Sequence, residues 1–188
     1  MDAGLFAAIN GLAGHVDSVD DIVELFTRVV PFVLVGLALL AWFWPGPRVE
    51  RDRRQWSAIV AGVGAALALG INQVIIRLWD RPRPFMTHSA TLLLAPSHDP
   101  SFPSDHAAFG FAVAVGLCFA WRRVGMLALL GAALLAFARV YTGEHYVGDV
   151  VAGGLIGAGA ALAVNQARPW VLPLLAPPLR LARRMRLA

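Results

Sequence analysis

The amino-acid sequence predicts an all-α integral membrane helical bundle with about five spanning helices. Three features of its composition support this fold class. Hydrophobic residues fill 58% of the 188 positions, only 15% of the residues are charged, and the mean hydropathy is +0.64. A soluble domain of this length would carry more charge and shorter apolar runs. We expect one domain over residues 1–188, because such a bundle uses the whole length.

Five stretches are long and apolar enough to be membrane spans. We expect these spans at residues 24–44, 56–78, 104–121, 124–141 and 147–166. Residues 3–16 are too short to span, so they predict a short interfacial helix at the amino-terminal end. Residues 168–188 hold four prolines, which interrupt helices, and several arginines, so they predict a basic cytoplasmic tail.

The charged residues predict the orientation of the bundle. The chain has 16 basic residues, all of them arginine, and a net charge of +4. Most of them lie in two connectors and in the tail, at Arg48, Arg51, Arg53, Arg54, Arg122, Arg123, Arg168, Arg180, Arg183, Arg184 and Arg186. If the spans alternate in direction, these positions share one face, which the positive-inside rule assigns to the cytoplasm. This pattern explains the charge without nucleic acid as a partner.

His145 and Asp149 stand four positions apart at the start of the fifth predicted span, so they are expected on one helical face. Asp149 can then accept a hydrogen bond from one imidazole nitrogen, which leaves the other nitrogen free for nucleophilic attack. Arg139 ends the preceding span and can reach the same pocket. A structural His–Asp pair that caps a helix is the alternative, and the nearby Arg139 and His106 favour catalysis.

The string Pro103-Ser104-Asp105-His106 begins the third predicted span. Ser104 is a good N-cap, and His106 falls in the first helical turn, where free backbone N–H groups can bind phosphate. His106 is therefore a candidate proton donor to a leaving oxygen. A plain capped helix start is the alternative reading of this string.

Arg83, which precedes Pro84, is the preferred phosphate ligand on the connection between the second and third spans. Its guanidinium can bind phosphate oxygens through two parallel hydrogen bonds. The nearby Arg77 and Arg81 fit an alternative role, the binding of lipid headgroups. The motif residues form three strings: Arg83-Pro84, Pro103–His106, and Arg139 with His145 and Asp149. The orientation predicted from the arginines places all three strings on the non-cytoplasmic face.

Other polar residues fit structural roles. Glu24 and Arg28 have the spacing of a helical ion pair, and Asn72 and Gln73 fit hydrogen bonds between helices better than a substrate groove. Cys118 fits a buried, inert thiol. The spacing of the ligand-type residues suggests no zinc, iron or paired magnesium site, so we expect neither a metal nor another cofactor.

The three strings resemble the motifs of the type-2 phosphatidic acid phosphatase superfamily, Lys-x6-Arg-Pro, Pro-Ser-Gly-His and Ser-Arg-x5-His-x3-Asp. This chain has Arg83-Pro84, then Pro103-Ser104-Asp105-His106, and then Ala138-Arg139 with His145 and Asp149. Further stretches resemble the bacitracin-resistance type of undecaprenyl pyrophosphate phosphatases, namely Arg81-Pro-Arg-Pro-Phe85, Ser101-Phe-Pro-Ser-Asp-His106 and Ile9-Asn-Gly-Leu-Ala-Gly14.

The resemblance implies roles for seven residues. They are His145 as nucleophile, Asp149 as its orienter, His106 as general acid, and Arg83, Ser104 and Arg139 as phosphate ligands, with Asp105 also at the substrate. A metal-independent phosphohistidine intermediate is implied as well. The chain departs from the pattern at three positions: Ile76 replaces the lysine, Asp105 the glycine and Ala138 the serine. Either Arg77 or Arg81 substitutes for this lysine, or no residue does. Asp105 adds a negative charge beside the phosphate, in agreement with the pyrophosphatase subgroup.

The resemblance thus implies an enzyme that converts undecaprenyl pyrophosphate to undecaprenyl phosphate, which recycles the cell-wall lipid carrier and confers bacitracin resistance. It implies a multi-pass protein of the bacterial inner membrane, with its site facing the periplasm or outside and with polyprenyl pyrophosphate and membrane lipids as partners. Two alternatives stay open. One is a phosphatase of another lipid phosphate, such as phosphatidylglycerol phosphate or phosphatidic acid, and the other is a non-catalytic lipid carrier.

Overall fold

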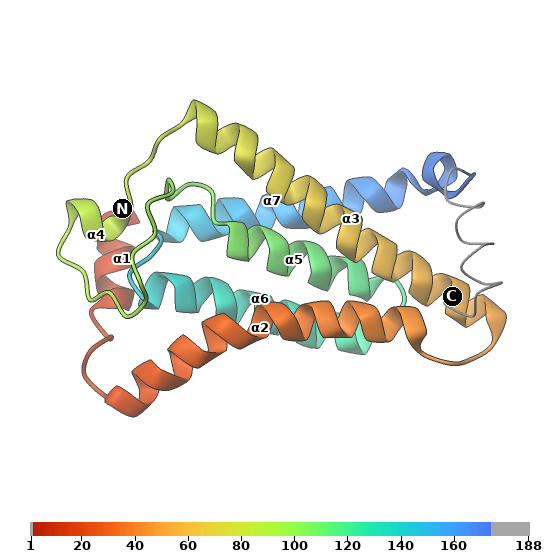
Figure 1. Ribbon diagram of the computed structural model, residues 1–188, viewed down its shortest axis with the longest axis horizontal. Helices are drawn as coiled ribbons and strands as arrows, with labels where there is room; N and C mark the ends of the chain where they lie inside the picture. Colours follow the sequence, from red (N-terminus) through yellow and green to blue (C-terminus); the bar gives the residue numbers. More distant parts are fainter. Residues whose placement is uncertain (1, 174–188) are drawn as a thin grey trace.

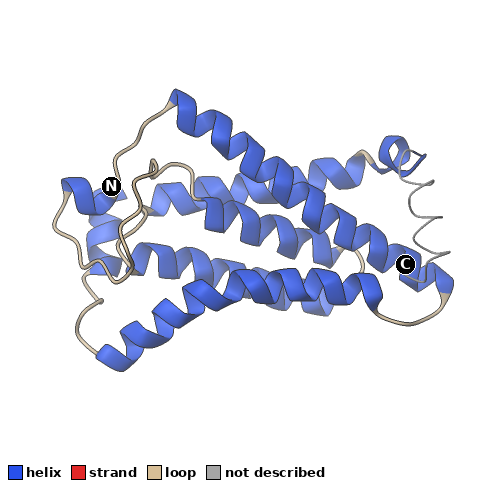
Figure 2. Ribbon diagram, viewed as in Figure 1, coloured by secondary structure: helices blue, strands red, loops and turns tan. Residues whose placement is uncertain are grey.

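The structure is a computed structural model that describes residues 2–173. Over this range the regular secondary structure is helical, which confirms the predicted all-α class (Figure 2). The helices are α1 (Asp2–Asn10), α2 (Asp17–Phe43), α3 (Arg48–Leu78), α4 (Pro84–Thr87), α5 (Asp105–Cys118), α6 (Arg122–Tyr141) and α7 (Val147–Gln166).

The predicted spans correspond to five of these helices. Four of them, α2, α3, α6 and α7, have the length and apolar composition of membrane spans. The third predicted span, residues 104–121, is shorter than expected, because α5 has 14 residues and ends at Cys118. At 1.5 Å per residue, α5 is only about 21 Å long. The interfacial helix is shorter too, since α1 ends at Asn10 and a turn follows with Gly14 at φ +80°. Residues 168–173 of the predicted tail are helical despite Pro169 and Pro173, and the part of the tail from residue 174 onward lies outside the described residues.

The shortest of the five, α5, lies in the centre of the bundle and packs against α3, α6 and α7 (Figure 1). Small residues allow this close approach. A side chain on Gly116 would collide with the backbone of Ala61 on α3, and one on Gly157 of α7 would collide with the backbone of Ala108. The buried core around α5 is accordingly rich in alanine. This is the packing expected of helices that associate within a membrane, where small residues bring backbones together.

The outer surface of the bundle carries large apolar side chains. Phe32 on α2 is 77% exposed, Leu127 on α6 is 69% exposed and Leu155 on α7 is 70% exposed. Apolar residues in such numbers on the outside of a helical bundle match a hydrocarbon environment rather than water. The chain is therefore a multi-pass membrane protein.

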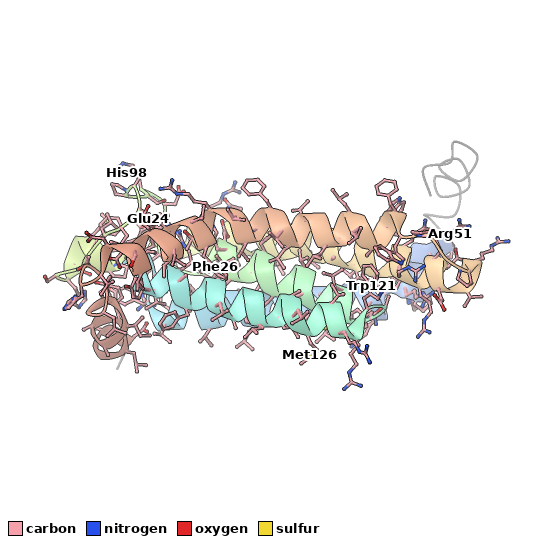
Figure 3. All side chains as sticks on the ribbon, turned by 90° about the horizontal axis from the view of Figure 1, so that it is seen from below. Glu24, Phe26, Arg51, His98, Trp121 and Met126 are labelled. Carbon is pink, nitrogen blue, oxygen red and sulfur yellow. The ribbon has the colours of Figure 1, made fainter. Side chains whose placement is uncertain are left out.

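The two ends of the bundle differ in character. Glu24 and His98 lie at one end, and Arg51 and Trp121 lie at the other (Figure 3). We call the first the site end and the second the arginine end. Helices α2 and α3 are joined at the arginine end and diverge toward the site end, where α1 and α4 lie (Figure 1). The predicted ion pair of Arg28 with Glu24 forms near the site end, at 3.1 Å.

Candidate active site

A cavity of about 300 Å³ lies at the site end, where the three motif strings meet. Of the seven predicted site residues, five line this cavity: Arg83, Asp105, His106, Arg139 and His145. Ser104 and Asp149 lie behind the wall, and each is completely buried. The helix ends and connections of a bundle with alternating direction thus bring distant parts of the sequence to one place.

His145 lies in the turn between α6 and α7 and is 3% exposed. Its Nδ1 atom is 2.8 Å from the main-chain oxygen of Ser101. A carbonyl oxygen can only accept a hydrogen bond, so this contact assigns the ring proton to Nδ1 and leaves Nε2 unprotonated. Burial lowers the pKa of His145 to about 4; Asp149 opposes this shift, and the charges of Arg139 and Arg83 add to it. The imidazole is therefore neutral near pH 7, as a nucleophile must be.

Asp149 is too far from His145 for the direct hydrogen bond that the sequence predicted. The closest approach is 3.7 Å, from Nδ1 to Oδ2. The prediction placed both residues on one helical face, but α7 begins at Val147, so His145 precedes the helix. Asp149 instead accepts hydrogen bonds from the main-chain N–H of Tyr146, at 2.8 Å, and from the hydroxyl of Ser101. The carboxylate therefore contacts the imidazole indirectly, through Ser101.

Glu144 holds together the two arginines that were predicted to bind phosphate. Its Oε2 atom accepts a hydrogen bond from Nη1 of Arg83 and lies 3.4 Å from Nη2 of Arg139. Arg83 is fixed further by its Nε, which donates to the main-chain oxygen of Asp99 at 2.8 Å. Burial raises the pKa of the Glu144 carboxyl, although the two arginines act in the opposite direction. A buried acid thus fixes both guanidinium groups in the cavity wall.

The segment Ser104–His106 begins α5 beside the cavity. Ser104 precedes the helix as predicted, but its hydroxyl makes no capping hydrogen bond and has no hydrogen-bond partner within residues 2–173. The Oδ1 atom of Asp105 accepts a hydrogen bond of 2.7 Å from Asn72, which confirms the structural role predicted for Asn72. His106 lies in the first turn of α5, where the helix dipole favours an anion. The buried Nε of Arg139 likewise has no hydrogen-bond partner in the described range.

The position of the missing family lysine faces the cavity. Ile76 stands at that position and lines the wall. Arg77 is exposed on α3, and the guanidinium of Arg81 is directed to Asp149, with 2.6 Å between Nη1 and Oδ1. Neither arginine is among the residues that line the cavity. This departure therefore replaces a cationic side chain with an apolar one.

Three residues of the site were not assigned from the sequence: Ser101, Glu144 and Arg81. The contribution of Ser101 comes largely from a main-chain oxygen, for which a sequence carries no signal. Glu144 gave a weak signal, since it is an acidic residue directly before His145 in a short turn between apolar helices. The sequence suggested Arg81 as a ligand for lipid headgroups or as a substitute for the missing lysine, whereas its guanidinium binds two carboxylates of the chain.

Comparison with known proteins gives a family and several relatives. Residues 57–173 match the PAP2 superfamily. The undecaprenyl-diphosphatase BcrC of Bacillus subtilis is 32% identical over 80% of this chain and 76% of its own length. The putative undecaprenyl-diphosphatase YbjG of Escherichia coli is 29% identical over 89% of this chain and 84% of its own length. A decaprenylphosphoryl-5-phosphoribose phosphatase of Mycobacterium tuberculosis is 36% identical, over 62% of this chain and 63% of that protein.

Two solved structures share the fold. LpxE of Aquifex aeolicus has a TM-score of 0.73 and 23% sequence identity, and the match covers 88% of this chain and 94% of that one. A PAP2-type phosphatidylglycerolphosphate phosphatase of Bacillus subtilis has a TM-score of 0.64 and 20% identity, and the match covers 90% of this chain and 85% of that one. At these identities, the likeness establishes the helical arrangement alone.

Proposed function

The chain belongs to the PAP2 superfamily, and we propose that it removes the terminal phosphate of undecaprenyl pyrophosphate to leave undecaprenyl phosphate. One observation carries this proposal: a buried, neutral His145 with Nε2 free lines a cavity that also holds two arginines. The similarity to BcrC supports the choice of lipid. The reaction would return the cell-wall lipid carrier to use and, by consuming its pyrophosphate form, confer resistance to bacitracin.

The first half of the reaction transfers the phosphoryl group to the enzyme. Nε2 of His145 attacks the terminal phosphorus, so a P–N bond forms while the bond from phosphorus to the bridging oxygen breaks. The negative charge of the bound pyrophosphate favours the protonated form of His106, which gives its proton to that oxygen as undecaprenyl phosphate leaves. Arg83 and Arg139 stabilise the charge that spreads over the transferred oxygens.

The second half releases phosphate. Water attacks the phosphohistidine, and His106, now neutral, takes a proton from this water as it adds. The P–N bond breaks and inorganic phosphate leaves, which restores the starting protonation states. Within residues 2–173, the hydroxyl of Ser104 and the Nε of Arg139 are buried donors without a hydrogen-bond partner, and a phosphate oxygen would satisfy them. The two buried donors without partners support the binding of an anion at this site.

An apolar groove supports a lipid substrate. It measures about 430 Å³, lies between α2 and α3 with α5 as its floor, and we call it the α2–α3 groove. On α3, Gln73 lines the cavity, while Leu69 and Gly62 line the groove at helical spacing along the same face. On α5, His106 and Phe109 are likewise three positions apart, the first in the cavity and the second in the groove. The polyprenyl chain would lie in this groove, with its head in the cavity.

The arginine end would face the cytoplasm, and the site end would face the periplasm or the outside. Arg48, Arg51 and Arg54 at the start of α3 and Arg122 at the start of α6 support this orientation under the positive-inside rule. A single cysteine introduced at exposed His98, in a Cys118→Ser background, would then react with an impermeant reagent added outside intact cells. A cysteine in place of Arg53 would not.

Phosphate release from undecaprenyl pyrophosphate tests the proposal, with the detergent-purified protein in excess EDTA beside the His145→Ala variant. We expect release by the wild-type chain that persists in EDTA and is absent in the variant. A phosphate label on His145 in a rapidly quenched reaction would identify the intermediate. Release that stops in EDTA would overturn the metal-free mechanism, and a variant with near-normal turnover would overturn the role of His145.

A phosphatase for another lipid phosphate is the second candidate, and the similarity to the decaprenylphosphoryl-5-phosphoribose phosphatase favours a polyprenyl-linked one. Competition separates the candidates. Phosphatidylglycerol phosphate, phosphatidic acid and a polyprenyl-linked sugar phosphate would each be tested for hydrolysis and as inhibitors of undecaprenyl pyrophosphate hydrolysis. A carrier that only binds lipid would hold the substrate without phosphate release, and this binding would survive loss of either histidine.

A further inference from the structure

The amino-terminal helix α1 reaches the active site through one ion-paired residue, Asp2. Its Oδ2 atom accepts a hydrogen bond of 2.6 Å from Nη2 of Arg81, and its Oδ1 atom accepts one of 2.9 Å from the main-chain N–H of Gly148. The other terminal nitrogen of Arg81, Nη1, donates to Oδ1 of Asp149 at 2.6 Å. The guanidinium of Arg81 therefore links α1 to the carboxylate of Asp149, which lies behind the cavity wall.

We propose that α1 is a positioning element for the catalytic histidine, which acts through the chain Asp2–Arg81–Asp149–Ser101 on the imidazole of His145. This inference rests on the proposed function in one respect, the use of His145 as the nucleophile. It assigns a task to a helix that has no place among the three motif strings.

Arg81 holds Ser101 by two routes. The main-chain oxygen of Arg81 accepts a hydrogen bond of 2.8 Å from the main-chain N–H of Ser101. Its side chain holds Asp149, which in turn accepts a hydrogen bond from the Ser101 hydroxyl. The carbonyl of Ser101 then accepts a hydrogen bond from Nδ1–H of His145. A shift of Arg81 would therefore move the acceptor that sets both the tautomer and the direction of the imidazole.

The guanidinium of Arg81 keeps its position only with the carboxylate of Asp2 as a second partner. The Arg81 side chain is 24% exposed, so water can compete for the guanidinium, whereas Asp149 is completely buried. The guanidinium lies 4.2 Å from the centre of the Tyr146 ring, which covers one face of it. Asp2 supplies the second carboxylate, and the opposing pull of two carboxylates fixes the guanidinium between α1 and α7.

Helix α1 is itself firmly docked at the site end. Phe6 is 1% exposed and packs edge-on against Tyr146, with the ring centres 5.6 Å apart. The buried side chain of Asn10 accepts a hydrogen bond from the main-chain N–H of Thr91 at 2.9 Å, and it donates to the main-chain oxygens of Thr91 and Tyr141 at 2.8 and 2.7 Å. These contacts give Asp2 a defined position from which to hold Arg81.

The test compares Asp2→Asn with Asp21→Asn, a matched change at an exposed aspartate on α2. We expect Asp2→Asn to lower kcat about tenfold with little change in KM, since displacement of a reacting group costs up to about 10²-fold. Asp21→Asn should leave kcat unchanged. Asp2→Glu keeps the carboxylate and should recover part of the loss. Gly148→Ala should also lower kcat, because its new methyl group would press on the Asp2 carboxylate.

A double-variant cycle and a spectroscopic signal separate positioning from simple stabilisation. In the Arg81→Gln background, Asp2→Asn should cost nothing further, because both residues act through one link. Nitrogen NMR of labelled histidine should show His145 with its proton on Nδ1 in the wild-type chain, and a mixture of tautomers or a mobile ring in Asp2→Asn. Unchanged kcat and an unchanged His145 signal in Asp2→Asn would overturn the proposal. The NMR result needs no substrate, so it decides the proposal even if the wild-type chain releases no phosphate from undecaprenyl pyrophosphate and the proposed function fails.

Discussion

The Nδ1 atom of His145 lies 2.8 Å from the main-chain oxygen of Ser101, a residue 44 positions earlier in the chain. The same serine donates its side-chain hydroxyl to Asp149. Ser101 therefore stands between the imidazole and the carboxylate, with its main chain on one side and its side chain on the other. The two contacts can be separated by mutation, because only the second depends on the side chain.

Ser101→Ala should lower turnover by about tenfold, because a hydrogen bond to a charged group contributes about 1.5 kcal/mol or more, and 1.4 kcal/mol is about tenfold. The variant keeps the carbonyl that accepts the hydrogen bond from His145 Nδ1. Single-turnover phosphate release from undecaprenyl pyrophosphate would measure the effect, with Ser89→Ala, at an exposed serine that does not line the cavity, as a control for the loss of a hydroxyl. Unchanged turnover in Ser101→Ala would show that Asp149 does not act through this hydroxyl.

Glu144→Gln should lower the melting temperature, and phosphate should restore more stability to the variant than to the wild-type chain. The substitution keeps the shape of Glu144 but leaves Arg83 and Arg139 without their shared buried counter-charge. Breaking a buried ion pair in this way costs about 3–5 kcal/mol, and a bound phosphate or vanadate would supply the missing negative charge.

Thermal unfolding with and without vanadate measures this difference. Glu24→Gln is the matched control, because Glu24 forms an ion pair with Arg28 on the surface rather than in the cavity wall. Equal vanadate-induced shifts in wild type and Glu144→Gln would contradict the view that Glu144 is the counter-charge of the phosphate site.

The sequence was sufficient to predict the helical class, the number of long apolar segments and the meeting of the three motif strings. Apolar length predicts spans, and alternation of direction brings every second connection to one face. The sequence was not sufficient to predict contacts that depend on packing in three dimensions. Arg83 and Glu144 are 61 positions apart, and nothing in either local sequence indicates their ion pair.

The spacing of His145 and Asp149 shows how a local rule failed. Four positions on a continuous helix would place the two side chains together. The helix begins only at Val147, so the rule does not apply to His145. The true start of α7 depends on the hydrogen bond from the main-chain N–H of Tyr146 to Asp149, which a pattern of apolar residues does not reveal.

The lowered pKa of His145, about 4, predicts a specific dependence of stability on pH. In the unfolded chain this histidine takes up a proton near its ordinary pKa of 6.5, whereas in the folded chain it stays neutral down to about pH 4. The unfolded state therefore binds more protons between these values, and the stability of the folded state falls as the pH is lowered from about 6.5 to about 4.

His145→Gln lacks this titration, so its free energy of unfolding should change less than that of wild type over the same pH range. Chemical unfolding at several pH values measures both chains. Nitrogen NMR of labelled histidine should place the midpoint of His145 near pH 4, with its signal assigned by its loss in His145→Gln. A midpoint close to 6.5 would contradict the assignment of a neutral nucleophile held by burial.

Gly62→Leu should weaken the use of a long polyprenyl substrate and spare a short one. Gly62 lines the α2–α3 groove, and a Cβ atom there would meet no atom within 4 Å, so the substitution directs a leucine side chain into the space proposed for the lipid. The loss of about six atom contacts of the lipid, at ~0.1–0.2 kcal/mol each, amounts to about 1 kcal/mol, or a roughly fivefold rise in KM. Steady-state kinetics with undecaprenyl pyrophosphate and with a short isoprenyl diphosphate would measure the two cases.

Gly159→Leu is the matched control for this change. Gly159 is exposed on α7, a Cβ atom there also meets no atom within 4 Å, and the residue does not line the α2–α3 groove. The control should leave KM unchanged for both substrates, because its leucine faces the surrounding lipid. If Gly62→Leu raised KM equally for the long and the short substrate, the effect would come from the phosphate cavity, and the polyprenyl chain would have to lie elsewhere on the bundle.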